Sequence, residues 1–146
     1  MIREERHLRV PGRFESLARI AEFVTAAAKS AEMTEDDVFH IEMAVDEACS
    51  NVIEHAYAHQ AGDIELTCSS DAPGSLKIVI MDQGRPFDPT AISQPVTANP
   101  DQLEALQEGG LGLYFMRKLM DEIHFEFVPS AGNRLTMIKH HHVQPE

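Results

Sequence analysis

Four strand-like segments arranged as two hairpins constrain the fold of this chain more than any other feature. Residues 64–68 and 76–81 are rich in apolar and β-branched side chains, and they flank a short turn that contains Pro-Gly. Residues 123–128 and 134–140 flank a second turn that contains Gly-Asn. Because strands joined by a short turn pair antiparallel, these segments predict a mostly antiparallel sheet.

Helical periodicity predicts a second layer. Apolar residues recur at helical spacing over 14–31 and again over 34–58, where the first residues, Thr-Glu-Asp-Asp, resemble a capping box. A third helix is predicted over 111–122, and a first strand over 3–10. This order of elements predicts an α+β fold, a two-layer sandwich in which helices cover one face of a mixed, mostly antiparallel sheet.

Length and charge limit the classes of function. The 146 residues are expected to form a single domain, 1–146. A formal net charge of −12, with Lys and Arg scattered, argues against direct binding to nucleic acid. No apolar run approaches the roughly 20 residues of a membrane span, so we expect no membrane association. Cys49 and Cys68 lack C-x-x-C spacing, which favours a reduced, cytoplasmic protein.

The first candidate site motif is a carboxylate and a carboxamide one helical turn apart. Glu47 and Asn51 are spaced i, i+4, so they share one face of the helix predicted over 34–58. A carboxylate can accept a proton from a hydroxyl group, and an amide oxygen is a suitable ligand for Mg²⁺. An isolated pair of this kind is more often a solvated helix face, so its weight depends on the motifs that follow.

The second motif is Asp-x-Gly at the end of the most apolar strand. Asp82 follows the run Ile-Val-Ile-Met, and a carboxylate there can accept a hydrogen bond from an exocyclic amine such as that of adenine. Gly84 would allow the backbone to approach a flat ring closely. Taken alone, the motif is more often a plain turn.

The third motif is rich in glycine and opens a helix. Gly109, Gly110, Leu111 and Gly112 can present backbone N–H groups to a phosphate at the helix start. The preceding segment, 83–110, holds four prolines and little periodicity, and a loop of that length is usually functional or disordered.

Histidines and basic residues offer weaker candidates. His55 and His59 are spaced i, i+4, but no third ligand stands at convincing spacing, so we do not expect a zinc site. Arg85, Arg117 and Lys118 are the basic residues near the presumed phosphate site. They could help to hold a triphosphate, or they could be solvated surface residues.

In this order the three motifs resemble those of the ATP-binding superfamily shared by gyrase, histidine kinases and mismatch-repair ATPases. The closer resemblance is to the anti-sigma-factor serine/threonine kinases, whose pattern is D-E-A-x-x-N-x-I-x-H-x-Y, D-x-G and G-G-x-G-L. Here these patterns stand at 46–57, 82–84 and 109–113, and the resemblance extends from about residue 10 to residue 140.

The resemblance implies the cofactors ATP and Mg²⁺ and a role for each motif. Glu47 would be the catalytic base, Asn51 the magnesium ligand and Asp82 the adenine anchor. Residues 109–112 would hold the phosphates, and a segment of about 85–110 would form the ATP lid.

The last motif of the family usually has Gly-Thr before the final strand. Here the sequence is Gly132-Asn133, so Asn133 departs from the pattern. Thr136 is then the residue expected to place a hydroxyl near the adenine.

The resemblance further implies a partner-switching function. The chain would phosphorylate an anti-sigma-factor antagonist and, when that antagonist is phosphorylated, bind a sigma factor. A homodimer through the first strand or helix is also implied. The alternative is a non-catalytic, ATP-gated module that binds its partner without phosphoryl transfer.

Overall fold

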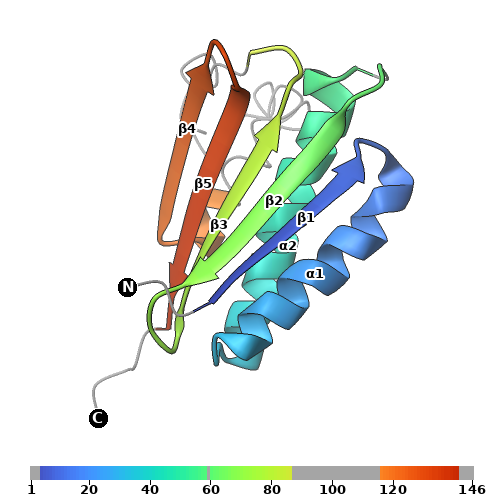
Figure 1. The fold of residues 1–146 in the computed structure, drawn as a ribbon. Helices are drawn as coiled ribbons and strands as arrows, with labels where there is room; N and C mark the ends of the chain where they lie inside the picture. The colour runs from blue at the N-terminus through green and yellow to red at the C-terminus, as the bar shows by residue number, and fades with distance from the viewer. Residues whose placement is uncertain (1–3, 59, 87–115, 142–146) are drawn as a thin grey trace, which may run out of the picture.

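The computed structural model describes residues 4–58, 60–86 and 116–141. The chain begins with a strand, continues through two helices, and then supplies four more strands (Figure 1). The elements are β1 (Glu4–Pro11), the short helix η1 (Phe14–Ser16), α1 (Leu17–Ser30), α2 (Glu35–Asn51), η2 (Val52–Ala56), β2 (Asp63–Ser70), β3 (Ser75–Asp82), β4 (Glu122–Val128) and β5 (Gly132–His140).

The five described strands form one sheet in the order β1-β2-β3-β5-β4, with β3 at its centre. Every neighbouring pair is antiparallel, which confirms the predicted α+β class and the antiparallel character of the sheet. No parallel pair occurs among these strands, so the expectation of a mixed sheet is not met within the described part. The β3–β5 register sets Asp82 opposite Asn133, at the end of the sheet where β3 finishes with the predicted adenine anchor.

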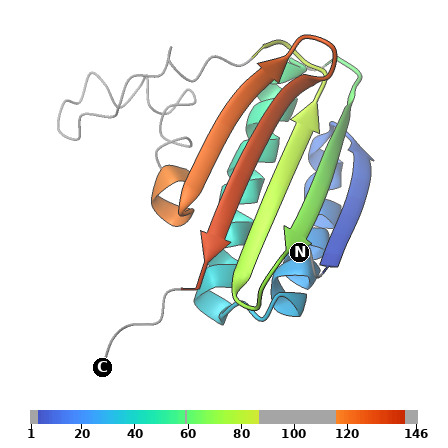
Figure 2. The same ribbon diagram turned by 60° about the vertical axis from the view of Figure 1, so that its left-hand side comes forward.

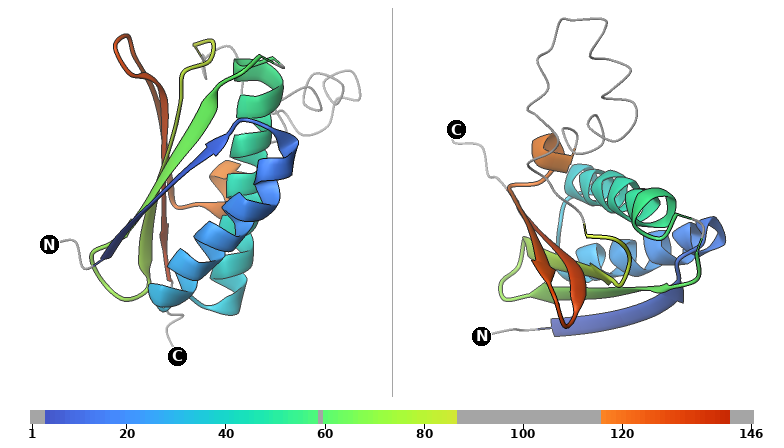
Figure 3. Two further views of the ribbon diagram at one scale, coloured as in Figure 1. Left: turned by 45° about the vertical axis from the view of Figure 1, so that its right-hand side comes forward. Right: turned by 90° about the horizontal axis from the view of Figure 1, so that it is seen from above.

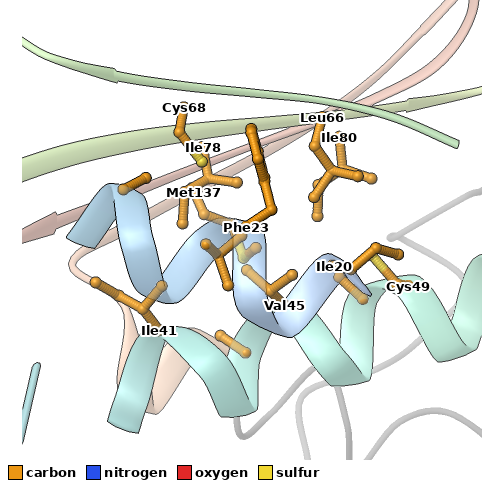
Figure 4. Packing of buried hydrophobic residues seen from close by; sticks show 14 of the residues in the cluster. Ile20, Phe23, Ile41, Val45, Cys49, Leu66, Cys68, Ile78, Ile80 and Met137 are labelled. Atoms are coloured by element: carbon orange, nitrogen blue, oxygen red, sulfur yellow. The ribbon is translucent and has the colours of Figure 1, made fainter. Parts of the chain in front are cut away.

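Helices α1 and α2 lie side by side against one face of the sheet, which makes the two predicted layers (Figures 2 and 3). The core fills the space between the layers, and Figure 4 shows Phe23 from α1 and Val45 from α2 pointing toward Ile78 of β3. The opposite face of the sheet carries the alternate, partly exposed residues of each strand. Among the residues that the structure describes, no helix is long and apolar enough to cross a membrane.

Two predicted helices differ from the observed ones at their ends. The helix predicted over 34–58 is α-helical only to Asn51, and the chain then continues as the single π-helical turn η2. Of the helix predicted over 111–122, the described part is helical only over 116–119. Glu122 instead opens β4, because it pairs with Ile138 of β5.

Candidate functional site

A pocket of roughly 320 Å³ lies between the end of α2 and the end of the sheet. This volume is at the lower end of the range typical of small-molecule sites. Asn51 and Asp82 both line the pocket, one from the helix layer and one from the sheet. Its apolar wall consists of Ala48, Val52, Ala56, Ile80, Pro86, Met116, Phe125 and Leu135, and its polar lining includes His55, Arg85, Glu126, Asn133 and Arg134.

Asp82 is the most completely buried carboxylate of this site, with 4% of its surface exposed. Its Oδ1 accepts two hydrogen bonds, from the backbone N–H of Gly84 at 2.8 Å and from the side-chain amide of Asn133 at 2.9 Å. Burial raises the pKa of Asp82 above its ordinary value, and the two hydrogen bonds oppose that rise. The carboxylate is therefore held in one orientation by two donors, in a pocket that has both apolar and polar lining residues.

Two glycines allow the backbone around Asp82 to pack this closely. A Cβ atom on Gly84 would lie 2.5 Å from the backbone carbon and oxygen of Ala56, so glycine is required where the turn meets the end of η2. This contact is with the protein itself, and Gly84 is not among the described residues that line the main pocket, so its approach to a flat ring stays a prediction. Gly132 has φ +94°, and a Cβ there would lie 2.1 Å from the carbonyl oxygen of Asp82.

Asn51 lies at the last position of α2, where the α-helix changes to the π-helical turn. Such π-helical turns within helices occur frequently at functional sites, since the extra residue redirects the side chains around it. Arg85 stabilises this end of the helix: its guanidinium donates to the carbonyl oxygen of His55 at 2.6 and 3.1 Å, and its backbone N–H donates to that of Ala56 at 2.8 Å. The turn that follows Asp82 is thereby tied to the helix end that carries Asn51.

Glu47 lies one turn before Asn51 on α2 and is partly buried, but it is not among the residues that line the pocket. Its pKa is raised above the ordinary value, first by burial and then by the like charges of Asp46 and Glu54. A carboxylate whose pKa is raised toward neutrality is a better proton acceptor than an ordinary one.

Thr136, expected beside the adenine, is not brought to the pocket. Side chains alternate along β5, so Thr136 lies on the face of the sheet opposite Asn133 and Leu135. Asn133, three residues earlier and 7% exposed, is the side chain that contacts Asp82. Sequence reasoning noted Asn133 only as a departure from the pattern. The period-two alternation of the predicted strand, counted back from the apolar Leu135 and Met137, places Asn133 on the inward face and is the signal that identifies it.

Several other predicted positions cannot be compared with the structure or lie apart from the pocket. Arg117 and Lys118 are exposed and do not line it, whereas Arg85 does. The remaining predicted positions, Gly109, Gly110, Leu111, Gly112, His59 and nearly all of the lid at 85–110, lie outside the described residues.

Comparisons with known proteins identify the family to which this fold and pocket belong. A model of the histidine kinase-like ATPase domain matches residues 10–139. The crystal structure of the RsbU and RsbW domains of Rv1364c from Mycobacterium tuberculosis shares the fold, with a TM-score of 0.66 and 15% identity. That alignment covers 94% of this chain and 32% of the other.

The chain belongs to the family of histidine kinase-like ATPase domains. Within it, the similar proteins are serine-protein kinases. Serine-protein kinase RsbW of Bacillus thuringiensis (strain Al Hakam) is 30% identical over 146 residues, which cover 94% of this chain and 85% of that protein. RsbW of Bacillus anthracis gives the same values. At this identity and coverage the chain is a member of the RsbW-type kinases of that family.

Proposed function

We propose that this chain is a serine/threonine protein kinase that transfers the γ-phosphate of ATP to an anti-sigma-factor antagonist and sequesters a sigma factor when that antagonist is phosphorylated. The observation that carries the proposal is the pocket itself, in which Asn51 of α2 and Asp82 of β3 line one apolar cavity. The relatives named serine-protein kinase RsbW support the class of reaction. We place the reaction in the cytoplasm, in keeping with two free, buried cysteines, Cys49 and Cys68.

The residues of the pocket fit a magnesium-bound adenine nucleotide. Apolar side chains from both layers, such as Val52 and Leu135, form walls suited to a flat ring, and Asp82 is an acceptor at the buried end. The Asn51 side chain supplies the neutral oxygen ligand that Mg²⁺ accepts alongside its waters. The nucleotide supplies the transferred phosphoryl group and the metal supplies charge neutralisation.

Three side chains would then have separate roles in nucleotide binding, metal binding and proton transfer. Asp82 accepts a hydrogen bond from the base and fixes the nucleotide at the polar end of the pocket. Asn51 binds the metal ion at the end of α2. Glu47 orients a serine or threonine hydroxyl of the partner and accepts its proton, as a general base does. We assign the phosphate contacts to residues 109–112, as the sequence pattern suggests.

The test is phosphoryl transfer by variants of Glu47. Purified wild-type chain with MgATP labelled at the γ-phosphate should label an antagonist protein from the same organism. Glu47→Gln removes the base but keeps the size of the side chain, so labelling should fall by roughly 100-fold or more while ATP affinity, measured by calorimetry, stays within a factor of about three. Glu22→Gln, an exposed position on α1, is the matched control and should leave both quantities unchanged.

The alternative function is an ATP-gated binding module without transfer. The position of Glu47 outside the pocket lining is the observation that favours it. In that case Glu47→Gln would leave ATP-dependent partner binding intact, and the wild type would label no antagonist. Labelling by the wild type that is lost in Glu47→Gln would exclude the alternative.

A further inference from the structure

We infer that Asn133 is a positioning residue for nucleotide recognition: its side-chain amide fixes the Asp82 carboxylate as a hydrogen-bond acceptor and so selects a 6-aminopurine over a 6-oxopurine. The inference rests on the proposed function, because it assumes that the pocket binds a purine nucleotide. It concerns a residue at which this chain departs from the pattern that its motifs otherwise follow.

The contacts of Asn133 are specific enough to fix its own orientation. Its Nδ2 donates to Asp82 Oδ1 at 2.9 Å and to the carbonyl oxygen of Arg85 at 2.7 Å. Both of these partners are acceptors, so the atom that faces them must be the NH₂ group, and its two hydrogens are both used. The β3–β5 register places the two side chains opposite each other.

The same contacts decide which oxygen of Asp82 is left for a ligand. Oδ1 accepts from Asn133 and from the backbone N–H of Gly84, so the carboxylate cannot rotate without breaking both bonds. Oδ2 accepts no hydrogen bond from any residue that the structure describes. Because Asp82 lines the pocket, Oδ2 is the oxygen available to a bound base.

The ionised form of Asp82 depends on these donors. Cys49 of α2 and Tyr57 after η2 interact electrostatically with the carboxylate, and neither a thiol nor a phenol can carry a positive charge. The other charged or titratable groups of the pocket lining are Arg85, Arg134, Glu126 and His55, and Arg134 is paired with Glu126 at 2.9 Å. None of these groups lowers the pKa of Asp82, whereas the hydrogen bonds from Asn133 and Gly84 do.

The choice between a 6-aminopurine and a 6-oxopurine follows from the charge state of Asp82. An ionised carboxylate only accepts hydrogen bonds, so it pairs with an exocyclic amine and repels a carbonyl oxygen. A protonated carboxyl group can donate to that carbonyl. Removing the amide of Asn133 favours the protonated, freely rotating form, and so weakens both the affinity for ATP and the discrimination against a 6-oxopurine.

The test compares Asn133→Thr with Asn133→Val, two side chains of one shape that differ in a hydroxyl donor. Binding of MgATP and MgITP is measured by calorimetry from pH 5.5 to 8, with circular dichroism to confirm folding. ITP differs from ATP by the 6-oxo group. Protonation of each nucleotide changes with pH in the same way whichever variant is present, so a difference between variants comes from the protein. Asn133→Val should lose roughly tenfold or more of its ATP affinity and of its preference for ATP over ITP. Its ATP binding should also be lost at a higher pH than in the wild type, because the hydrogen bond that lowers the pKa of Asp82 is missing. Asn133→Thr should restore both properties.

Equal ATP preference and equal pH profiles in the valine and threonine variants would overturn the inference. If the valine variant does not fold, Asn133→Ala and Asn133→Ser repeat the comparison with smaller side chains. Asp82→Asn distinguishes the role of Asn133 from nucleotide binding by the pocket. Loss of ATP binding in Asp82→Asn together with unchanged behaviour in Asn133→Val would overturn the role of Asn133 and leave the nucleotide function standing. A wild type that binds no ATP would overturn both.

Discussion

At the scale of single residues, the surroundings of Glu47 are unusual for their lack of positive charge. Helix α2 carries six carboxylates between Glu35 and Asn51 and no Lys or Arg. Glu47 is partly buried and has Asp46 and Glu54 as charged neighbours, so every cause acting on its pKa raises it. A site built in this way keeps the proton of the carboxyl group to a higher pH than an exposed glutamate would.

This gives a prediction for the pH dependence of phosphoryl transfer. A general base must be ionised, so kcat/KM should fall as the pH falls through the pKa of Glu47 in the free enzyme, and that acid limb should lie above the ordinary value of 4.5. Asp46→Asn removes a like charge and should move the limb to lower pH. Glu22→Gln removes one charge on α1 and should leave it in place. An acid limb that does not respond to Asp46→Asn would argue against Glu47 as the titrating group.

How far the site could be predicted from the sequence differs from one residue to the next. The motifs that contain Asn51 and Asp82 suffice to assign both residues to one nucleotide site by resemblance, and both line the pocket. The contact between Asp82 and Asn133 could not be predicted, because it depends on the pairing of β3 with β5 across 51 residues. The same long-range register decides that Thr136 lies on the far face.

At the scale of elements, the start of β5, directly after the β4–β5 turn, packs closely against the backbone of Asp82 at the end of β3. Gly132 and Gly74 both have positive φ, +94° and +79°, so alanine at either position costs about 1 kcal/mol or more in backbone strain. Only at Gly132 does the added Cβ meet backbone, 2.1 Å from the Asp82 oxygen, whereas at Gly74 the nearest atom is the Cβ of His141 at 3.2 Å.

We therefore predict that Gly132→Ala lowers the free energy of unfolding by about 2 kcal/mol more than Gly74→Ala does. It should also weaken ATP binding, because the backbone of Asp82 must move, while Gly74→Ala should leave ATP affinity unchanged. Urea unfolding measures the first quantity and calorimetry the second. Equal losses of stability in Gly132→Ala and Gly74→Ala would mean that the backbone at Gly132 can shift to accommodate a Cβ without moving Asp82.

The boundaries of elements show what local pattern cannot supply. The periodicity of residues 34–58 is compatible with one continuous helix, and a change to π-helical bonding at Val52 leaves no signature in the spacing of apolar residues. The helix predicted over 111–122 ends earlier than expected, at residue 119, because the pairing of Glu122 with Ile138 outweighs the local preference of that residue. Both differences lie at element ends, where tertiary contacts decide between neighbouring conformations.

At the scale of the whole molecule, sheet order is the property that the sequence determines least. The two hairpins were predictable from their turns, but β5 lies between β3 and β4, so the second hairpin joins the first through its last strand. Nothing in the local pattern of the second hairpin specifies whether β4 or β5 pairs with β3. Burial specifies it, since Met137 of β5 is fully buried beside Ile78 whereas β4 remains at the edge with most of its residues partly or fully exposed.

The net charge of −12 is a second property of the whole molecule that affects its stability. With 24 Asp and Glu against 12 Lys and Arg, repulsion among carboxylates should destabilise the folded chain at low ionic strength. Raising NaCl from 10 to 150 mM shortens the Debye length from about 30 to about 8 Å. The ion pairs of Arg6, Arg9 and Arg134 are exposed, so their screening costs little, and the net effect should be a gain of about 1 kcal/mol, or roughly 4 °C in Tm.

Glu54→Lys tests the origin of that gain, because it changes the net charge by two, from −12 to −10, at an exposed position. This variant should have a higher Tm than the wild type at 10 mM NaCl and a smaller increase on adding salt. Glu54→Asp keeps the charge and should follow the wild type. If Glu54→Lys instead gains as much from salt as the wild type does, the stabilisation arises from something other than screening of the acidic surface.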